Sequence, residues 1–307
     1  DLGEISSSAV IVDLQAPEHQ DGDIVSYAWE GEDYQFVWGE NAFANIDDAI
    51  NSANAKGSTS LQALIPENSH QTSWEGDFII TADTTNIKSL EVFGINRRFD
   101  PNDKSAASSD PTADWTLNPD WDMYARNGGT SAMNRITFNC NDDNNNVILS
   151  GKVKFKGITM RNIVWNSERK EGTAENPRNL DLIFENVLVD FTAASGSGGY
   201  LFNLNSPRSN SKTFAADDSL TLRNFRIEKF LYKSGKNRIM GTYGPNNITL
   251  DGFYYNGGRN ELNGTNYPLA QFGWIQTSPA AKSSEVYILN SNFRNDNVAF
   301  NTAPISN

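Results

Sequence analysis

The sequence predicts an all-β chain that winds as a solenoid, a parallel β-helix, with one short helix capping its N-terminal end. Three observations predict this fold. A strand-like frame recurs five times, the same kind of residue interrupts every copy, and a helix-period segment stands before the first strand of the array.

The repeated frame is an alternation of apolar and variable positions that stops at one Asn or Gly and then resumes. Alternation with a period of two indicates a strand with one buried face. The copies are KVKFKGITMRNI, DLIFENVLVDF, SLTLRNFRIEKF, NITLDGFYYNGG and EVYILNSNFRND, and SLEVFGIN, which contains Gly94, is a more diverged copy.

The interrupting residues are Gly157, Asn186, Asn224, Gly252 and Asn290, which follow one another at intervals of 28 to 38 residues. Gly and Asn are the residues that most readily adopt a left-handed backbone conformation, so each interruption predicts a corner between two short strands. A hydrophobic frame repeated every 20 to 50 residues or so indicates a solenoid, in which each unit covers the next. The strands of a β-sandwich also alternate, but a sandwich has no reason to repeat the corner residue.

This frame resembles that of the pectate-lyase-like right-handed β-helix superfamily over about residues 34–300. The resemblance implies a right-handed coil with an Asn ladder at one corner, where Asn186, Asn224 and Asn290 stand. It rests on the frame and not on an invariant motif. The catalytic signatures of the glycosidases and esterases with this fold, such as Asp-Phe-Ile-Phe-Gly, are absent.

A helical segment is predicted before the first strand of the array. Apolar residues recur at helical spacing at Phe43, Ile46, Ala49, Ile50 and Ala53. The pattern ends near Lys56 and Gly57, and the apolar strand LQALIPE follows. The segment is similar to the helix that caps many β-helices, where it covers strand edges that would otherwise be unpaired.

The domain organisation that follows is an N-terminal strand and linker over residues 1–33 and one solenoid over residues 34–307, with a long loop inserted at about 97–129. The single Cys140 excludes an internal disulfide framework. The sequence contains no run of about 20 apolar residues, so no membrane-spanning segment is predicted. A net charge of −13 argues against nucleic acid as a partner, and it disfavours a polyanionic ligand unless Ca²⁺ bridges the two.

One column of charges is a candidate site. The position before each corner holds Lys156, Glu185, Arg223 and Asp251 in successive copies. In adjacent strands these groups would stack about 4.7 to 4.9 Å apart with alternating sign, which stabilises the register. Arg223 is the weak candidate for a lyase base, but its two flanking carboxylates hold its proton and favour the structural interpretation.

The loop insertion is the candidate ligand site. Trp115, Trp121 and Tyr124 would form a stacking platform for sugar rings, with Asp120, Asp122 and Arg126 available for hydroxyl groups. Alternatively, the Trp side chains pin the loop to the coils. The acidic runs DPND and NCNDDNNN offer hard oxygen ligands for Ca²⁺, or they are solvated turns; no other cofactor is expected.

The N-terminal strand is apolar on both faces, with the apolar residues Ala9, Val10, Ile11, Val12 and Leu14. Two outcomes are open. The strand folds back along its own solenoid, or it adds to a sheet of a neighbouring subunit and builds an extracellular fibre.

The function that the sequence favours is a structural or adhesive module that faces glycans. Polar loops and a hydrophobic share of 38% are typical of a secreted or surface-displayed protein. The alternative is a polysaccharide lyase or glycoside hydrolase on the same fold.

Overall fold

The computed structural model describes residues 5–13, 18–29, 32–66, 78–80, 86–94, 122–124, 134–139, 151–161, 163–168, 180–193, 199–204, 219–232, 237–240, 247–255, 270–272, 285–293 and 300–302. These residues are mostly strands, with one short helix. The all-β prediction is therefore confirmed.

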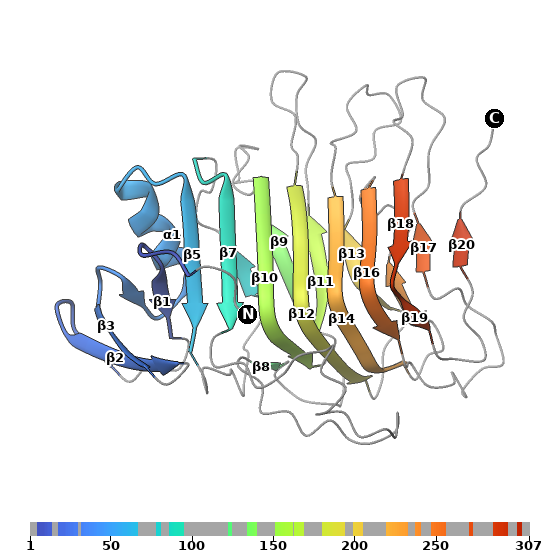
Figure 1. Cartoon of the computed structure of the whole chain (residues 1–307), viewed down its shortest axis with the longest axis horizontal. Coiled ribbons are helices and arrows are strands. Elements are labelled where there is room, and N and C mark those ends of the chain that lie inside the picture. The colour runs from blue at the N-terminus through green and yellow to red at the C-terminus, as the bar shows by residue number, and fades with distance from the viewer. Residues whose placement is uncertain are drawn as a thin grey trace.

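The largest element is an 11-stranded sheet whose strands pair in parallel. Its main path runs in the order β18 (Glu285–Leu289), β16 (Asn247–Tyr255), β14 (Ser219–Tyr232), β12 (Leu180–Ala193), β10 (Gly151–Arg161), β7 (Ser89–Gly94), β5 (Ser60–Ile65), β1 (Val10–Val12) and β4 (Ala42–Phe43). Beside this path, β8 (Asp122–Tyr124) pairs with β10 and β19 (Asn292–Phe293) pairs with β16. Figure 1 shows the long strands side by side in chain order.

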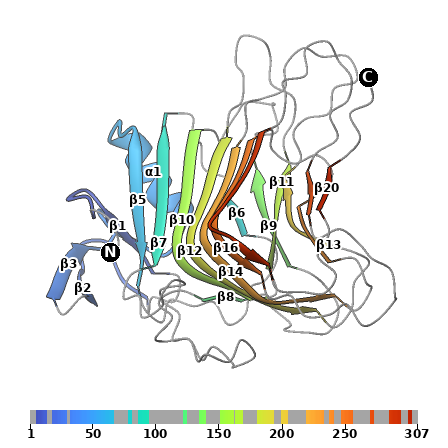
Figure 2. The same cartoon turned by 45° about the vertical axis from the view of Figure 1, so that its right-hand side comes forward.

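A second, five-stranded parallel sheet lies behind the first in Figure 1 and to its right in Figure 2. Its order is β15 (Asn237–Met240), β13 (Gly199–Leu204), β11 (Ile163–Glu168), β9 (Asn134–Asn139) and β6 (Phe78–Ile80). A further parallel pair joins β17 (Ala270–Phe272) to β20 (Phe300–Thr302). From β9 to β16 successive strands alternate between the two sheets. The odd-numbered strands belong to the second sheet and the even-numbered strands to the large sheet.

The core lies between the two sheets. Phe155 and Phe184 stack with ring centroids 5.3 Å apart, and Phe225 and Phe253 stack 5.8 Å apart. Phe202 of the second sheet approaches Phe184 at 5.1 Å. All five rings are almost completely buried. We call the face of the large sheet that carries Phe155 and Phe184 the inner face and the opposite face the outer face.

The predicted corners are confirmed. The backbone angle φ is positive at Gly157 (68°), Asn186 (53°), Asn224 (47°), Gly252 (66°) and Asn290 (49°). The pairing on either side of each break places these residues opposite one another in neighbouring strands. Figure 2 shows the strands bending together.

The corner side chains also contact one another. Asn224 Nδ2 donates to Asn186 Oδ1 at 3.3 Å, the first rung of the expected Asn ladder. A Cβ at position 252 would lie only 2.7 Å from Asn224 Oδ1, so the next corner is occupied by Gly. Asn290 Nδ2 instead donates to Asp251 Oδ1 at 3.1 Å.

The predicted helix is α1 (Ile46–Ala55). Asn45 caps it by accepting a hydrogen bond from the backbone N–H of Asp48, and Asp47 and Asp48 in the first turn complement the helix dipole. The helix buries Ile46, Ala49, Ile50 and Ala53 and packs on β5, β4 and β1. Phe43, which was grouped with the helix, belongs to β4 instead.

An antiparallel hairpin of β2 (Ile24–Trp29) and β3 (Glu32–Val37) was not predicted. The sequence interpretation treated residues 1–33 as a strand and a linker, and the boundary at residue 33 falls inside β3. The hairpin lies at the N-terminal end of the large sheet (Figure 1).

Candidate functional site

The candidate site is the outer face of the large sheet just before the corners. The strand register aligns eight residues of eight strands in a single column: Ile11, Leu64, Phe93, Lys156, Glu185, Arg223, Asp251 and Leu289. We call this the outer column. The four charged residues singled out in the sequence are therefore direct neighbours, in the order expected.

Glu185 is the centre of the charged part of the column. Its carboxylate lies 2.9 Å from Lys154 Nζ, 3.6 Å from Lys156 Nζ and 3.5 Å from Arg223 Nη1. Lys154 and Lys156 are two positions apart on β10, so both project from the same face toward β12. A single carboxylate thus bridges two strands.

The electrostatic surroundings keep Glu185 ionised. Its partial burial acts to raise the pKa, but the hydrogen bond from Lys154 and the charges of Lys154, Lys156 and Arg223 outweigh it. The pKa of Glu185 therefore lies below its ordinary value. A carboxyl group of this kind is a poor general acid at neutral pH.

The two lysines are also held from the other side. Lys154 Nζ and Lys156 Nζ each lie 5.7 Å from the ring centroid of Phe93 on β7, within the range of cation–π attraction. Lys156 is almost completely buried. Phe93 thus marks the boundary at which the outer column changes from apolar to charged.

Arg223 links Glu185 to the next strand. Its Nε lies 3.8 Å from Asp251 Oδ2, and its side chain is 45% exposed. The guanidinium group lies between two carboxylates, which is the arrangement that the structural interpretation requires.

The loop candidates fall largely outside the described residues. Trp115, Asp120, Trp121 and Arg126 lie there, as do the acidic run DPND and most of NCNDDNNN. The backbone of Asp122 and Tyr124 belongs to β8, which pairs with β10 beyond its corner. The long insertion therefore returns to the large sheet at this point, while the proposed ligand contacts stay a prediction.

The N-terminal strand lies inside the large sheet of its own chain. β1 pairs with β5 on one side and with β4 on the other. Val10 and Val12 face inward, Ile11 faces outward, and all three are buried. Of the two outcomes that the sequence leaves open, the structure shows the first, because the strand extends the large sheet of its own chain. Leu14 lies outside the described residues.

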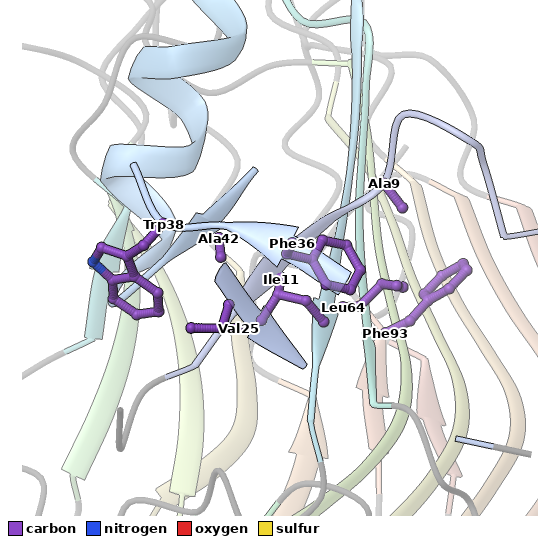
Figure 3. Close-up of a cluster of buried hydrophobic side chains, with 8 residues drawn as sticks. All are labelled: Ala9, Ile11, Val25, Phe36, Trp38, Ala42, Leu64 and Phe93. Atoms are coloured by element: carbon purple, nitrogen blue, oxygen red, sulfur yellow. The ribbon is translucent and has the colours of Figure 1, made fainter. Parts of the chain in front are cut away.

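The hairpin explains why β1 is apolar on both faces. Val25 and Phe36 of the hairpin pack on the outer face against Ile11, Leu64 and Phe93, and the buried group is completed by Ala9, Trp38 and Ala42 (Figure 3). We call these eight residues the outer cluster. Both faces of β1 are thus covered within one chain.

A hydrogen bond attaches the hairpin to the residue that follows β1. Tyr27 Oη donates to Asp13 Oδ2 at 2.9 Å. Burial, the charge of Asp13 and this bond raise the pKa of Tyr27 well above its ordinary value. The tyrosine therefore remains a neutral donor throughout the physiological range.

The opposite end of the large sheet holds a feature that sequence reasoning missed. All five residues of β18 are exposed, including Val286 (37%), Tyr287 (52%), Ile288 (42%) and Leu289 (49%). The sequence contained one indication of this exposed apolar strand. Leu289 stands at the position before the corner where the preceding copies have Lys, Glu, Arg or Asp. Among the described strands β18 pairs only with β16.

Neither a metal cluster nor a membrane helix is found in the described ranges. There, no three His, Cys, Asp or Glu side chains converge as metal ligands would. No helix in the same ranges has the length and apolar character needed to cross a membrane. Searches against protein-family models, curated proteins and solved structures found no match to the chain.

Proposed function

We propose that the chain closes into a right-handed parallel β-helix and serves as a structural and adhesive module, secreted or displayed at a cell surface. Two features support the closed coil. The chain alternates between two parallel sheets, and five bent strands carry left-handed corners in register. A strand, a corner and a strand of the facing sheet are the parts of one coil.

The observation that carries the functional part is the mutual pairing of charges in the outer column. Glu185 contacts three cations and Arg223 contacts two carboxylates. Catalysis on a polysaccharide requires an acid, a base or a nucleophile directed at the substrate. Here the charges neutralise one another along the sheet, which is what a rigid scaffold needs.

The adhesive part of the proposal rests on the loop at about 97–129. Its aromatic residues, Trp115, Trp121 and Tyr124, are suited to stacking on sugar rings. The pairing of β8 with β10 ties one end of this loop to the rigid sheet. Loops anchored on a rigid scaffold are where binding usually occurs. Ca²⁺ would serve as a bridge if the glycan is acidic.

The test is a panel of acidic and neutral polysaccharides, each assayed with and without Ca²⁺. We expect binding that is weakened by Trp121→Ala, with neither new reducing ends nor the ultraviolet absorbance of an unsaturated product. Absence of binding to every polymer in the panel would contradict the adhesive function.

The alternative is a polysaccharide lyase or glycoside hydrolase, and one observation favours keeping it. Arg223 is the more exposed partner in both of its ion pairs, so its guanidinium group is accessible to a substrate. Turnover that disappears in Arg223→Ala and persists in Thr221→Ala, an outer-face neighbour on the same strand, would establish the catalytic function. Under our proposal neither variant has turnover to lose, and Arg223→Ala costs only about 0–1 kcal/mol of stability.

A further inference from the structure

We infer that β18 is an interface between two copies of this chain, paired edge to edge in antiparallel orientation about a two-fold axis. β18 lies at the end of the large sheet opposite to β1, and its pairing does not depend on whether the protein binds or cleaves glycans.

β18 offers an edge with apolar side chains on both faces of the sheet. Val286 and Ile288 continue the inner-face columns of Ile248 and Leu250, whereas Tyr287 and Leu289 continue the outer ones. Ile248 and Leu250 are almost completely buried, yet their neighbours on β18 are 37% and 42% exposed. A strand added at this edge would bury these side chains and pair the backbone groups of β18 that bond to no other described strand.

The β4 end of the large sheet in another copy cannot supply the strand that pairs with β18. There β4 has only two residues, and beyond it Trp38 forms a bridge with Ala42. The helix α1 packs on β4, and the outer cluster closes the face. Head-to-tail addition of copies is therefore blocked, which leaves a two-fold contact of β18 with itself.

Two copies of β18 are complementary to each other when they run antiparallel. With Tyr287 on the axis, Tyr287 lies opposite its own copy, and Val286 lies opposite Ile288 of the second copy. Aromatic pairs are favourable across strands, and the Val286–Ile288 pairs would bury apolar surface. The inner faces of the two copies then lie on the same side, so the cores continue end to end.

The charges are compatible with this register. Glu285 is the only charged residue of β18, and its carboxylate already accepts a hydrogen bond from Tyr287 Oη at 3.2 Å. In the proposed pairing it lies opposite Leu289. The two copies of Glu285 are then about 13 Å apart along the strands, beyond the Debye length of about 8 Å at physiological salt.

The test is the molar mass of the full chain in solution as a function of concentration, by light scattering and sedimentation. We expect a concentration-dependent dimer that Tyr287→Lys dissociates, with a dissociation constant at least ten times higher, because two cations would face each other on the axis. The matched control is Ile24→Lys on the hairpin, where the apolar side chain is 70% exposed; this variant should dimerise like the wild type.

Cross-linking tests the register. In a background with Cys140→Ser, Tyr287→Cys should form an intermolecular disulfide on mild oxidation, because the two positions are directly opposed. Val286→Cys should not, since it lies opposite position 288. A wild-type chain that stays monomeric at every concentration, or a dimer that Tyr287→Lys leaves intact, would overturn the inference.

Discussion

The two ends of the large sheet differ in how the outer column terminates. At the N-terminal end Ile11, Leu64 and Phe93 are buried beneath the hairpin, with exposures of 0%, 0% and 3%. At the C-terminal end Leu289 occupies the same column and is 49% exposed. Each inner strand of the sheet is flanked by two neighbours, so the terminal strands need another cover. At one end the chain supplies it, and at the other we propose that a second copy does.

Deleting residues 1–20 should have the largest effect. The deletion removes β1 from between β5 and β4 and takes Ile11 out of the outer cluster. We expect an insoluble chain or the loss of cooperative unfolding, measured by circular dichroism and light scattering. If the truncated chain is a soluble, fully folded monomer and the full-length chain forms polymers, strand donation by residues 8–14 is correct instead.

A pair of truncations in the outer column should separate the two ends quantitatively. Ile11→Ala removes a completely buried side chain and should lower the free energy of unfolding by about 2–5 kcal/mol. Leu289→Ala at dilute concentration should change it by no more than about 0.5 kcal/mol, because the side chain is exposed in the monomer. Urea denaturation measures both. Equal losses would show that β18 is covered within its own chain.

Corner substitutions should show a smaller contrast. Asn224→Ala replaces a residue that tolerates the left-handed conformation by one that does not, and it removes the bond to Asn186, at a cost of about 1–2 kcal/mol. Asn224→Gly keeps the backbone conformation and should cost less. Asn290→Ala should also cost less than Asn224→Ala, since β18 can fray from the end of the sheet. Denaturant midpoints of the three variants decide the order.

Acidification should act on the middle of the sheet, where the outer column is charged. The pKa of Glu185 is lowered in the folded chain, so its contribution to stability is present above the unfolded pKa of about 4.3 and is lost as the pH falls through the folded value. Glu185→Gln should therefore flatten the stability profile below about pH 5. Glu285→Gln at the exposed end is the control. In this variant the free energy of unfolding should fall more steeply below about pH 5 than it does in Glu185→Gln. Identical profiles for the two variants would refute the role of Glu185.

The sequence by itself determined the repeating strands, the five corners and the helix α1. These features depend on local preferences: alternation selects a strand, and Asn or Gly accepts the positive φ of each corner. It also determined the order of Lys156, Glu185, Arg223 and Asp251, because equal spacing from the corner brings them into register once the strands are parallel. It left open whether β1 stays in its own chain.

Only the tertiary structure decided what covers the two ends. β1 pairs with β5 and β4 although the whole hairpin lies between β1 and β4 in the sequence, and such non-local pairing leaves no short-range signal. Val25 and Phe36 of the hairpin, which bury the outer side of Ile11, stand in the short segments IVSYAW and EDYQFV, and nothing local in these segments indicates that they cover β1. The sequence pattern of β18 likewise does not predict its exposure, because an apolar strand has the same pattern whether or not a neighbouring strand covers its edge.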